Sequence, residues 1–379
     1  MKKKIIIVGD LFPVVTNINK FSDGDINYLF GEKICDLFDA ADYRICNLEG
    51  PLTNRPGKCE KTGLKVYAPT SVVTSYKKLH IDCCTLANNH ITDAGDEGVI
   101  DTMKTLDSVD IDYIGAGLNR DAINHKKFIK LGNKVIGFFN VAETMFNAPT
   151  AEKPGAFLYD EYIVCNELRM MKKQSDYIIV IYHGGAEKFR YPSPQTRLRF
   201  HRMADCGADM ILSQHTHCIG CEEIYNGSYL LYGQGNFLFR SYNNEYTDTG
   251  LIIELQICSD SFKVKKHLVE AINDTVRYSS SQNFYDFDER SKRVTDDAFI
   301  KNEYIKYCEK ELTGYLMAFK SPSKVLGLWN RLLYRGYRKW LFSSAYSRYN
   351  LLKILHTLRS EQNRETAITG ITHLLEEQE

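Results

Sequence analysis

Two histidines one residue apart, His215 and His217, follow a short apolar run and have the chemistry to bind a metal ion together. The run, residues 208–212, predicts a short buried strand. At the end of a strand both imidazoles can lean into one cleft while Thr216 points away, because side chains alternate along extended backbone. Neutral imidazole is the commonest metal-binding side chain. For such a pair taken alone, ordinary packed or surface histidines are the alternative.

Carboxylate, amide and imidazole side chains also follow other apolar runs. They are Asp10 after residues 5–9, Glu49 at the end of Asn47-Leu48-Glu49 after residues 43–46, Asn89 and His90 after 83–87, and His183 after 177–182. Such side chains suit divalent ions such as Mn²⁺, Fe²⁺ or Zn²⁺. His90 directly follows a ligand-type Asn, so we predict a general acid there, the alternative being a histidine that caps its loop.

The elements that position these side chains alternate between short β-branched runs and longer helical patterns. Residues 28–38 have a helical period, with Leu29, Ile34 and Leu37 on one face. Alternating strands and helices predict an α/β fold, whose sites lie beyond the carboxyl ends of the strands. We predict a main domain over residues 1–275, a polar linker over 276–300 and a helical region over 301–379.

Composition limits the class of protein. The chain has 379 residues, of which 44% are hydrophobic, and its formal charge is zero. A large core is therefore expected, and the charge balance argues against a nucleic-acid partner. No apolar run reaches the ~18 residues of a membrane helix, and the first residues lead into a strand without a signal region. These features predict a cytoplasmic protein.

The cysteines give weaker information. Their number, 11, is odd and they are scattered, which predicts reduced thiols rather than a disulfide framework. Cys218 and Cys221 form a CxxC pair that could be half of a zinc site or a redox pair. The chain has no second CxxC, so ordinary buried cysteines are the favoured interpretation.

The helical region contains an unusual basic stretch. Residues 313–360 carry nine Lys and Arg residues and no Asp or Glu, with aromatic residues between them. A basic, aromatic, amphipathic stretch can lie on an anionic membrane surface or bind a polyanion, which predicts possible peripheral contact at the inner membrane face. The alternative is a helical hairpin packed on the main domain with its arginines in water.

Short motifs occur over residues 4–257 in an order that resembles the CapA family, the bacterial capsule and poly-γ-glutamate synthesis proteins of the calcineurin-like metallophosphoesterase superfamily. The motifs are Gly9-Asp10, Asn47-Leu48-Glu49-Gly50, Asn88-Asn89-His90 with Asp93, His183-Gly184-Gly185, Gly207-Ala208-Asp209, His215-Thr216-His217 and Gly235-Asn236-Phe237. The resemblance implies a four-layer αββα sandwich, here with a C-terminal helical appendage, and a centre of two divalent metal ions.

The resemblance also implies a role for each site residue. Glu49 would bridge the two ions. Asp10 and His217 would complete the shell of one ion, and Asn89, His183 and His215 that of the other. His90 would protonate the leaving oxygen and Asp93 would orient His90.

Two positions depart from the pattern that the resemblance implies. Phe12 stands where many metallophosphoesterases have a histidine, so one metal position lacks a nitrogen ligand. Gly184 stands where the family usually has a tryptophan, which predicts a wider pocket beside His183.

The leading functional hypothesis is a metal-dependent hydrolase of a phosphate ester or related bond in capsule, poly-γ-glutamate or envelope glycan metabolism. Its substrate would be an anionic polymer or a phosphorylated glycan. The alternative is a non-catalytic metal-binding partner in a capsule or poly-γ-glutamate assembly complex. A third hypothesis is an amide hydrolase that acts on the γ-linked polymer.

Overall fold

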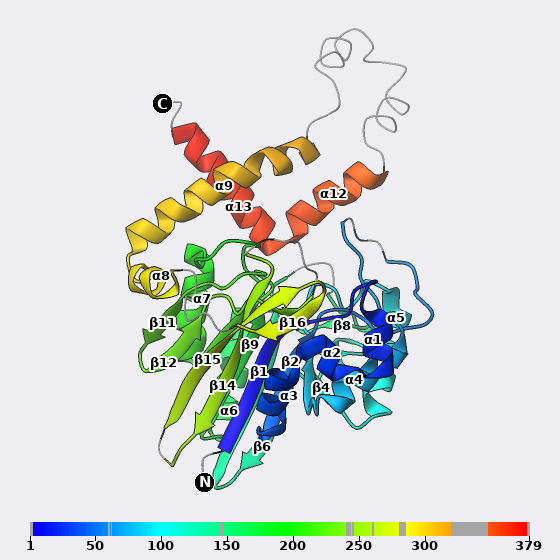
Figure 1. Cartoon of the computed structure of the whole chain (residues 1–379). Helices are drawn as coiled ribbons and strands as arrows, with labels where there is room; N and C mark the ends of the chain where they lie inside the picture. The colour runs from blue at the N-terminus through cyan, green and yellow to red at the C-terminus, as the bar shows by residue number, and fades with distance from the viewer. Residues whose placement is uncertain are drawn as a thin grey trace.

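The computed structural model describes residues 3–59, 61, 63–144, 148–239, 244, 246–259, 261–279, 286–319 and 348–376. Two mixed β-sheets pack face to face, helices cover their outer faces, and further helices cross one end of the sandwich (Figure 1). The predicted fold, a four-layer αββα sandwich with a C-terminal helical appendage, is confirmed.

The first sheet contains the N-terminal strand at its centre. Its strands are β1 (Lys3–Leu11), β2 (Tyr43–Leu48), β3 (Cys83–Thr85), β4 (Asp112–Ile114), β13 (Asn236–Leu238), β14 (Thr249–Ile257), β15 (Phe262–Ile272) and β16 (Thr275–Tyr278). Their order is β16-β15-β14-β1-β2-β3-β4, and β13 also pairs with β1. Strands β1 to β4 are parallel, so their carboxyl ends share one edge.

The second sheet is built in the same way. Its strands are β6 (Lys126–Leu131), β7 (Lys134–Ala142), β9 (Tyr177–His183), β10 (Met210–Gln214), β11 (Glu222–Tyr225) and β12 (Ser228–Leu231), in the order β11-β12-β10-β9-β7-β6. Strands β7, β9 and β10 are parallel. A small antiparallel pair joins β5 (Ala116–Gly117) to β8 (Gly155–Ala156).

Helices flank both sheets. Those of the main domain are α1 (Ile18–Asp23), α2 (Ile26–Phe30), α3 (Glu32–Asp39), α4 (Val73–Lys78), α5 (Gly95–Asp107), α6 (Glu161–Lys172) and α7 (Pro194–Asp205), with the 3-10 turns η1 (Thr70–Val72) and η2 (Arg120–Ala122). The C-terminal helices are α8 (Phe287–Arg293), α9 (Asp297–Phe319), α12 (Arg348–Arg359) and α13 (Glu361–Glu376).

Strand alternation explains the layers. In β1, Ile5 and Ile7 face the core between the sheets, whereas Ile6 and Val8 face the core under helices α1 to α5. In the second sheet, Ile179 of β9 faces the core between the sheets, and alternate residues of the same strand pack against α6 and α7. A strand apolar on both faces is buried on both sides, which is why these strands appear in the sequence as continuous apolar runs.

The structure differs from two predicted boundaries. The helix predicted over residues 28–38 is divided into α2 and α3 at Gly31, whose φ of 72° is incompatible with a continuous right-handed helix. The segment 276–300, predicted as a linker, contains most of β16 and all of α8. The division of the chain into domains stays a prediction.

The cysteine prediction is wrong at one pair. Cys165 of α6 and Cys206 after α7 form a disulfide, with their Cα atoms 5.3 Å apart. The two helices pack side by side, and this proximity cannot be read from cysteine spacing. Disulfides are typical of oxidising compartments, so cysteine usage no longer supports a cytoplasmic location. Cys218 and Cys221 are buried, unpaired thiols, and burial raises the pKa of Cys218 to about 11.

None of the described helices is both long enough and apolar enough to cross a membrane. Much of the basic stretch 313–360 lies outside the described residues, which omit 320–347. Its predicted affinity for anionic surfaces therefore stays a prediction.

Candidate metal centre

The candidate ligands meet where the carboxyl ends of the two parallel cores face each other. From the first sheet, Asp10 lies near the end of β1, Glu49 directly follows β2, and Asn89 follows β3. From the second sheet, His183 is the last residue of β9, and His215 and His217 follow β10. The structure thus brings together all six predicted ligands, although they come from two sheets and from both halves of the main domain.

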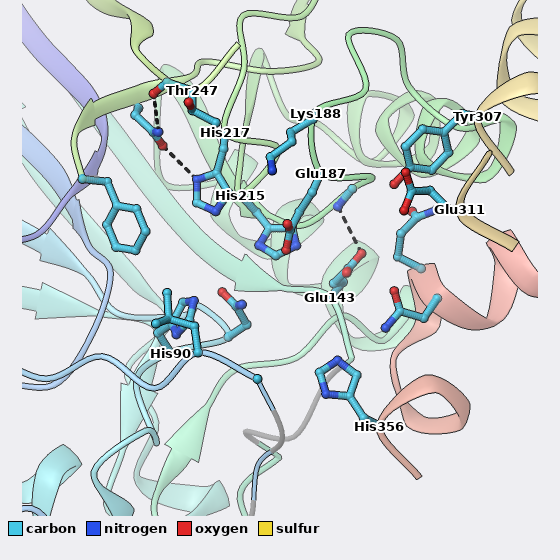
Figure 2. Close-up of a pocket in the computed structure, with 18 of the residues that line it drawn as sticks. His90, Glu143, Glu187, Lys188, His215, His217, Thr247, Tyr307, Glu311 and His356 are labelled. Carbon is cyan, nitrogen blue, oxygen red and sulfur yellow. Dashed lines mark hydrogen bonds between the residues drawn. The ribbon is translucent and has the colours of Figure 1, made fainter. Parts of the chain in front are cut away.

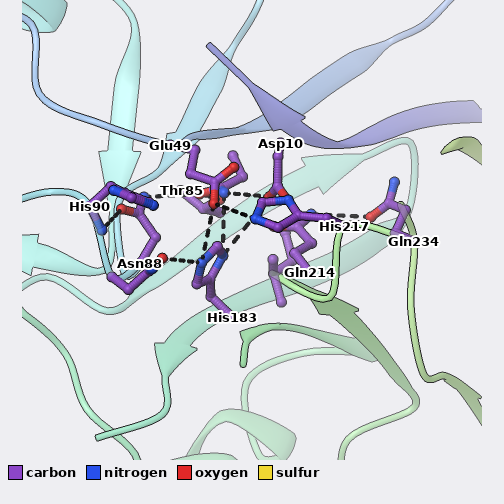
Figure 3. A network of polar contacts seen from close by, with 12 residues as sticks. Asp10, Glu49, Thr85, Asn88, His90, His183, Gln214, His217 and Gln234 are labelled. Atoms are coloured by element: carbon purple, nitrogen blue, oxygen red, sulfur yellow. Dashed lines mark hydrogen bonds and ion pairs between the residues drawn. The ribbon is translucent and has the colours of Figure 1, made fainter. Parts of the chain in front are cut away.

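Glu49 lies at the centre of this group (Figure 3). Its Oε1 atom is 3.7 Å from His183 Nε2 and 3.9 Å from His217 Nε2. Asp10 Oδ2 is 3.3 Å from His217 Nδ1, and Asp10 Oδ1 is 4.0 Å from His183 Nδ1. Asn89 joins the group through its Oδ1, which is 2.8 Å from His183 Nε2.

Two sets of potential ligand atoms each lie within 4.8 Å of one another, and Glu49 belongs to both. One set is Glu49, His215 and His217, and the other is Asp10, Glu49 and His183. A shared carboxylate matches the bridging role expected for Glu49. The pairing of the other ligands differs from the expected one, which groups Asp10 with His217 and His183 with His215.

Unpartnered polar atoms test whether the residues fit a metal. Both carboxylate oxygens of Glu49 and Nδ1 of His215 are buried and have no hydrogen-bond partner among the described residues. Burying a charged oxygen without a partner is costly, and native structures rarely leave it so. Carboxylate oxygens and imidazole nitrogens converging on common points are the donor set of divalent ions such as Mn²⁺, Fe²⁺ or Zn²⁺. The residues therefore fit the implied cations.

The electrostatics of the two carboxylates support the same conclusion. Burial and the neighbouring Asp10 carboxylate raise the pKa of Glu49 well above its usual range. Burial would also raise the pKa of Asp10, but a hydrogen bond and charge from His217 lower it below its usual value. Two facing buried carboxylates are unfavourable unless positive charge lies between them, and a bound cation is often the largest local charge in such a site.

Asparagine side chains hold the ligands in place. Asn47 Nδ2 donates to Asp10 Oδ1 at 2.7 Å and lies 3.3 Å from His183 Nδ1. Asn88 Nδ2 donates to Asn47 Oδ1 at 3.1 Å and to the Leu48 carbonyl at 2.8 Å. Groups that hydrogen-bond to metal ligands fix their orientation, so this network predefines the site.

His90 stands beside the ligands in the arrangement expected of a proton donor. Its Nδ1 donates to Asp93 Oδ2 at 2.6 Å, so Nε2 is the nitrogen left for the cavity that His90 lines. Lys61 Nζ donates to Asp93 Oδ1 at 2.7 Å and lies 3.1 Å from His90 Nδ1. Burial and the Lys61 cation lower the pKa of His90, against the opposing effect of Asp93.

The residue Lys61 was not predicted, because it lies in a loop whose composition gives no signal of a buried lysine. It also donates to the Asn89 carbonyl at 3.0 Å, so it joins the His90 loop to a candidate ligand.

A second unpredicted residue, Glu143, occupies the space beside Gly184. A Cβ atom at Gly184 would lie 2.8 Å from Tyr182 Cε1 and 2.9 Å from Glu143 Oε2, so the predicted widening beside His183 is wrong. Glu143 Oε2 accepts from the Gly185 N–H at 3.1 Å, and its buried Oε1 has no partner among the described residues. Burial raises the pKa of Glu143 to about 8. It directly follows β7, so the strand-end pattern could have identified it.

Phe12 is buried in the hydrophobic core under the helices, and its side chain offers no ligand. Its backbone N–H donates to the Leu238 carbonyl at 2.7 Å, which ties the end of β1 to β13.

The group of candidate ligands, which we call the metal cluster, lies at the base of a cavity of about 520 Å³ (Figure 2). Its floor and walls include Asn89, His90, Glu143, Glu187, Lys188, His215, His217, Asn236 and Phe239, and its opposite side is made by Tyr307, Lys310, Glu311, His356, Gln362 and Asn363. The cavity therefore lies between the main domain and the C-terminal helices.

Known proteins resemble most of this chain. Residues 4–241 match the family described as "Bacterial capsule synthesis protein PGA_cap". The PGA biosynthesis protein CapA of Bacillus subtilis is 28% identical over 221 residues, which cover 57% of this chain and 58% of the relative. The capsule biosynthesis protein CapA of Bacillus anthracis is 25% identical over 263 residues, covering 66% and 63% of the two chains. The match thus spans about three fifths of these relatives.

A protein of Mycobacterium tuberculosis named as a polyglutamine synthesis accessory protein is 27% identical over 228 residues, covering 56% of this chain and 60% of the relative. Among solved structures, the NAD nucleotidase of Haemophilus influenzae has a TM-score of 0.45 at 12% identity, and the match covers 81% of this chain and 60% of that one. The 5'-nucleotidase precursor of Thermus thermophilus has a TM-score of 0.43 at 11% identity, and the match covers 83% of this chain and 59% of that one.

Proposed function

The chain belongs to the PGA_cap family of bacterial capsule synthesis proteins, and from that premise we propose that it is a metal-dependent hydrolase of a phosphate ester or related bond. Its substrate would be an anionic polymer or phosphorylated glycan of capsule, poly-γ-glutamate or envelope metabolism. The names of the matched relatives support the metabolic setting, and the geometry of the site supports the chemistry.

The observation that carries the proposal is the position of Glu49. It belongs to two overlapping sets of ligand atoms, and both of its oxygens are buried without partners among the described residues. A shared carboxylate between two ligand sets is the arrangement of a two-metal centre. Divalent ions held there would supply an activated water and charge stabilisation at a phosphoryl group.

The residues of the chain itself would then divide the remaining work. The ions would be held by Asp10, Glu49, Asn89, His183, His215 and His217, with Asn47 fixing Asp10. His90 would pass to the leaving oxygen a proton taken up at Nε2, because its Nδ1 already donates to Asp93 and this carboxylate stabilises the protonated ring. Lys61 offsets the charge of Asp93 and so keeps this carboxylate ionised.

A non-catalytic metal-binding partner in a capsule or poly-γ-glutamate assembly complex is the second candidate. Phe12 favours it, because this buried phenyl ring leaves the end of β1 with only Asp10 as a ligand. The M. tuberculosis relative is itself named as an accessory protein. Hydrolysis of the amide bonds of a γ-linked polymer stays a third hypothesis, since an activated water and a proton donor serve that reaction as well.

A direct activity assay separates these candidates. Full-length protein with added Mn²⁺ should release product from a generic aryl phosphomonoester or phosphodiester, and His215→Ala should abolish the release because it removes a ligand. Metal-stimulated release from a γ-glutamyl polymer alone would favour the amide hydrolase. Metal binding without any hydrolysis would favour the assembly partner.

A further inference from the structure

The cavity over the metal cluster is closed by helices that lie outside the family match, which ends at residue 241. His356 comes from α12 and Glu311 from α9, and both point into the cavity that His90 and His217 line from the other side (Figure 2). Together α9, α12 and α13 form what we call the roof. Without the roof, the metal cluster would face an open surface between the strand ends.

Polar contacts near the N-terminal end of α13 fix the roof to the main domain. Glu361 pairs with the buried Arg199 of α7, and its N–H donates to the Thr144 carbonyl at 3.2 Å. Ser193 Oγ donates to Glu365 Oε2 at 3.1 Å. These contacts place α13 directly above the end of β7, from which Glu143 enters the cavity.

Aromatic packing fixes α9 to the same place. Phe189 lies with its ring centroid 4.9 Å from that of Tyr307 and 5.8 Å from that of Tyr304. The buried Tyr304 hydroxyl accepts from Gln362 Nε2 at 2.6 Å, which joins α9 to α13. The roof is therefore held at a defined height over the metal cluster.

The roof side of the cavity has its own chemistry. Glu311 contributes a carboxylate, and His356 contributes an imidazole whose pKa burial and the Lys61 cation lower to about 4, so it is neutral near pH 7. A carboxylate and a neutral imidazole both accept hydrogen bonds, and they suit a ligand group rich in hydroxyl or amino donors.

The size of the cavity, about 520 Å³, falls within the range of roughly 300–1,000 Å³ typical of small-molecule sites. It has room for a sugar-sized unit beside a phosphoryl group. A cavity of this volume suits a small molecule or the terminal unit of a chain better than a long segment of polymer.

We propose that the roof makes this site specific for a phosphate ester of a hydroxyl- or amino-bearing unit, taken as a small molecule or as the end of a chain, and that His356 and Glu311 bind that unit. The proposal rests on the proposed hydrolase function for its reaction but not for its binding site. His356 and Glu311 act as specificity-determining residues, since the ligands and His90 lie on the opposite side.

The test compares two substrates in the full-length, Mn²⁺-loaded protein. Glucose 1-phosphate carries the hydroxyl groups that the roof would bind, and phenyl phosphate does not. His356→Ala and Glu311→Gln should each raise KM for glucose 1-phosphate about tenfold, as expected for a lost hydrogen bond to the ligand, while kcat and the values for phenyl phosphate change little.

Matched controls lie on the roof helices α9 and α13, outside the cavity. His373 of α13 and Glu309 of α9 pair with each other at 3.0 Å, and neither lines the cavity. His373→Ala and Glu309→Gln should leave both KM values unchanged. Equal effects of the roof and control variants, or equal losses on both substrates, would overturn the proposal.

Two further measurements test the proposal: one measures binding without catalysis, and the other uses a polymeric substrate. If the wild-type protein hydrolyses neither ester, the proposed hydrolase function fails. Calorimetric binding of glucose 1-phosphate still tests whether the roof binds the ligand. His356→Ala must weaken this binding, and His373→Ala must leave it unchanged. With a glycerol phosphate oligomer as the substrate, release of single units shows attack at the chain end. Release of internal fragments would contradict a roofed site.

Discussion

Glu49 Oε1 lies 3.7 Å from His183 Nε2, across the junction between the two sheets. Glu49 follows β2 of the first sheet and His183 ends β9 of the second, so the contact joins the carboxyl ends of the two parallel cores. Neither oxygen of Glu49 has a hydrogen-bond partner among the described residues. Two sheets whose ends bring buried, unsatisfied ligand atoms to one point form a site that a cation would complete.

His90→Asn should retain bound metal but lower turnover by ~10² to 10⁴, the usual contribution of a positioned general acid. The reason is its geometry: Asp93 fixes Nδ1 at 2.6 Å, and His90 belongs to neither set of close ligand atoms. Steady-state rates and metal content measured on the same preparation check this. His80→Asn, an exposed histidine, is the control. Loss of metal together with activity would show that His90 is a ligand instead.

Glu223→Gln should lower the free energy of unfolding by roughly 1–3 kcal/mol at pH 7, because Glu223 accepts charge-assisted hydrogen bonds. Its carboxylate is bound by Arg197 at 2.6 Å, His201 at 3.1 Å and Tyr232 at 2.8 Å. Although burial raises the pKa of Glu223, these partners lower it to about 2.

The sign of the pH dependence follows from that lowered pKa. A depressed carboxylate pKa contributes stability above the unfolded value of 4.5, and this stability is lost as pH falls toward about 2. Urea unfolding at a series of pH values should therefore show the difference between wild type and Glu223→Gln shrinking below pH 4.5. Glu152→Gln, at an exposed site, should show no such trend. A difference that stays constant down to pH 2 would exclude the ionised Glu223 as its source.

Thiol titration in denaturant without reductant should find nine free cysteines of the 11 in the chain. The remaining two, Cys165 and Cys206, are joined between α6 and α7. Cys165→Ser should leave Cys206 as an additional reactive thiol. Complete reactivity of all cysteines before reduction would contradict the disulfide and restore the prediction of reduced thiols.

The basic stretch should give the full-length protein affinity for anionic vesicles, since each cation near such a surface contributes up to about 1 kcal/mol. Truncation is unsuitable as a test, because it would remove the roof of the cavity. Four cations of the stretch should instead be replaced by Gln, namely Arg331, Arg335, Arg338 and Lys339. Co-sedimentation should fall, and wild-type binding should weaken as salt rises.

The matched control for this stretch replaces four exposed lysines of the main domain, Lys130, Lys153, Lys173 and Lys263. If both sets of substitutions reduce vesicle binding equally, the attraction is a general charge effect and the stretch has no special role.

The convergence of the candidate ligands could be predicted from the sequence because its signal is local. Each candidate follows an apolar run, and parallel strands bring their carboxyl ends to one edge. Glu143 follows such a run too, but it lies far in the sequence from the recognised motifs and was therefore not predicted.

Other features depend on tertiary contacts that no local pattern records. Lys61 is buried only because Asp93 and the Asn89 carbonyl lie around it. His356 lines the cavity on α12, which is followed directly by α13, and α13 is tied to α7 through the pair between Glu361 and Arg199. The break at Gly31 depends on a positive φ that a helical period does not reveal.

The most direct test of the account is the metal content of full-length protein and of Glu49→Gln after loading with Mn²⁺ and removal of excess ion. Glu49 is shared by both sets of ligand atoms, so this near-isosteric change should reduce bound metal at both positions and abolish metal-dependent hydrolysis while leaving the fold intact. The account predicts two ions in the wild-type protein and a large loss in the variant. Wild-type protein that binds no divalent ion, or a Glu49→Gln variant with the metal content of wild type, would contradict it.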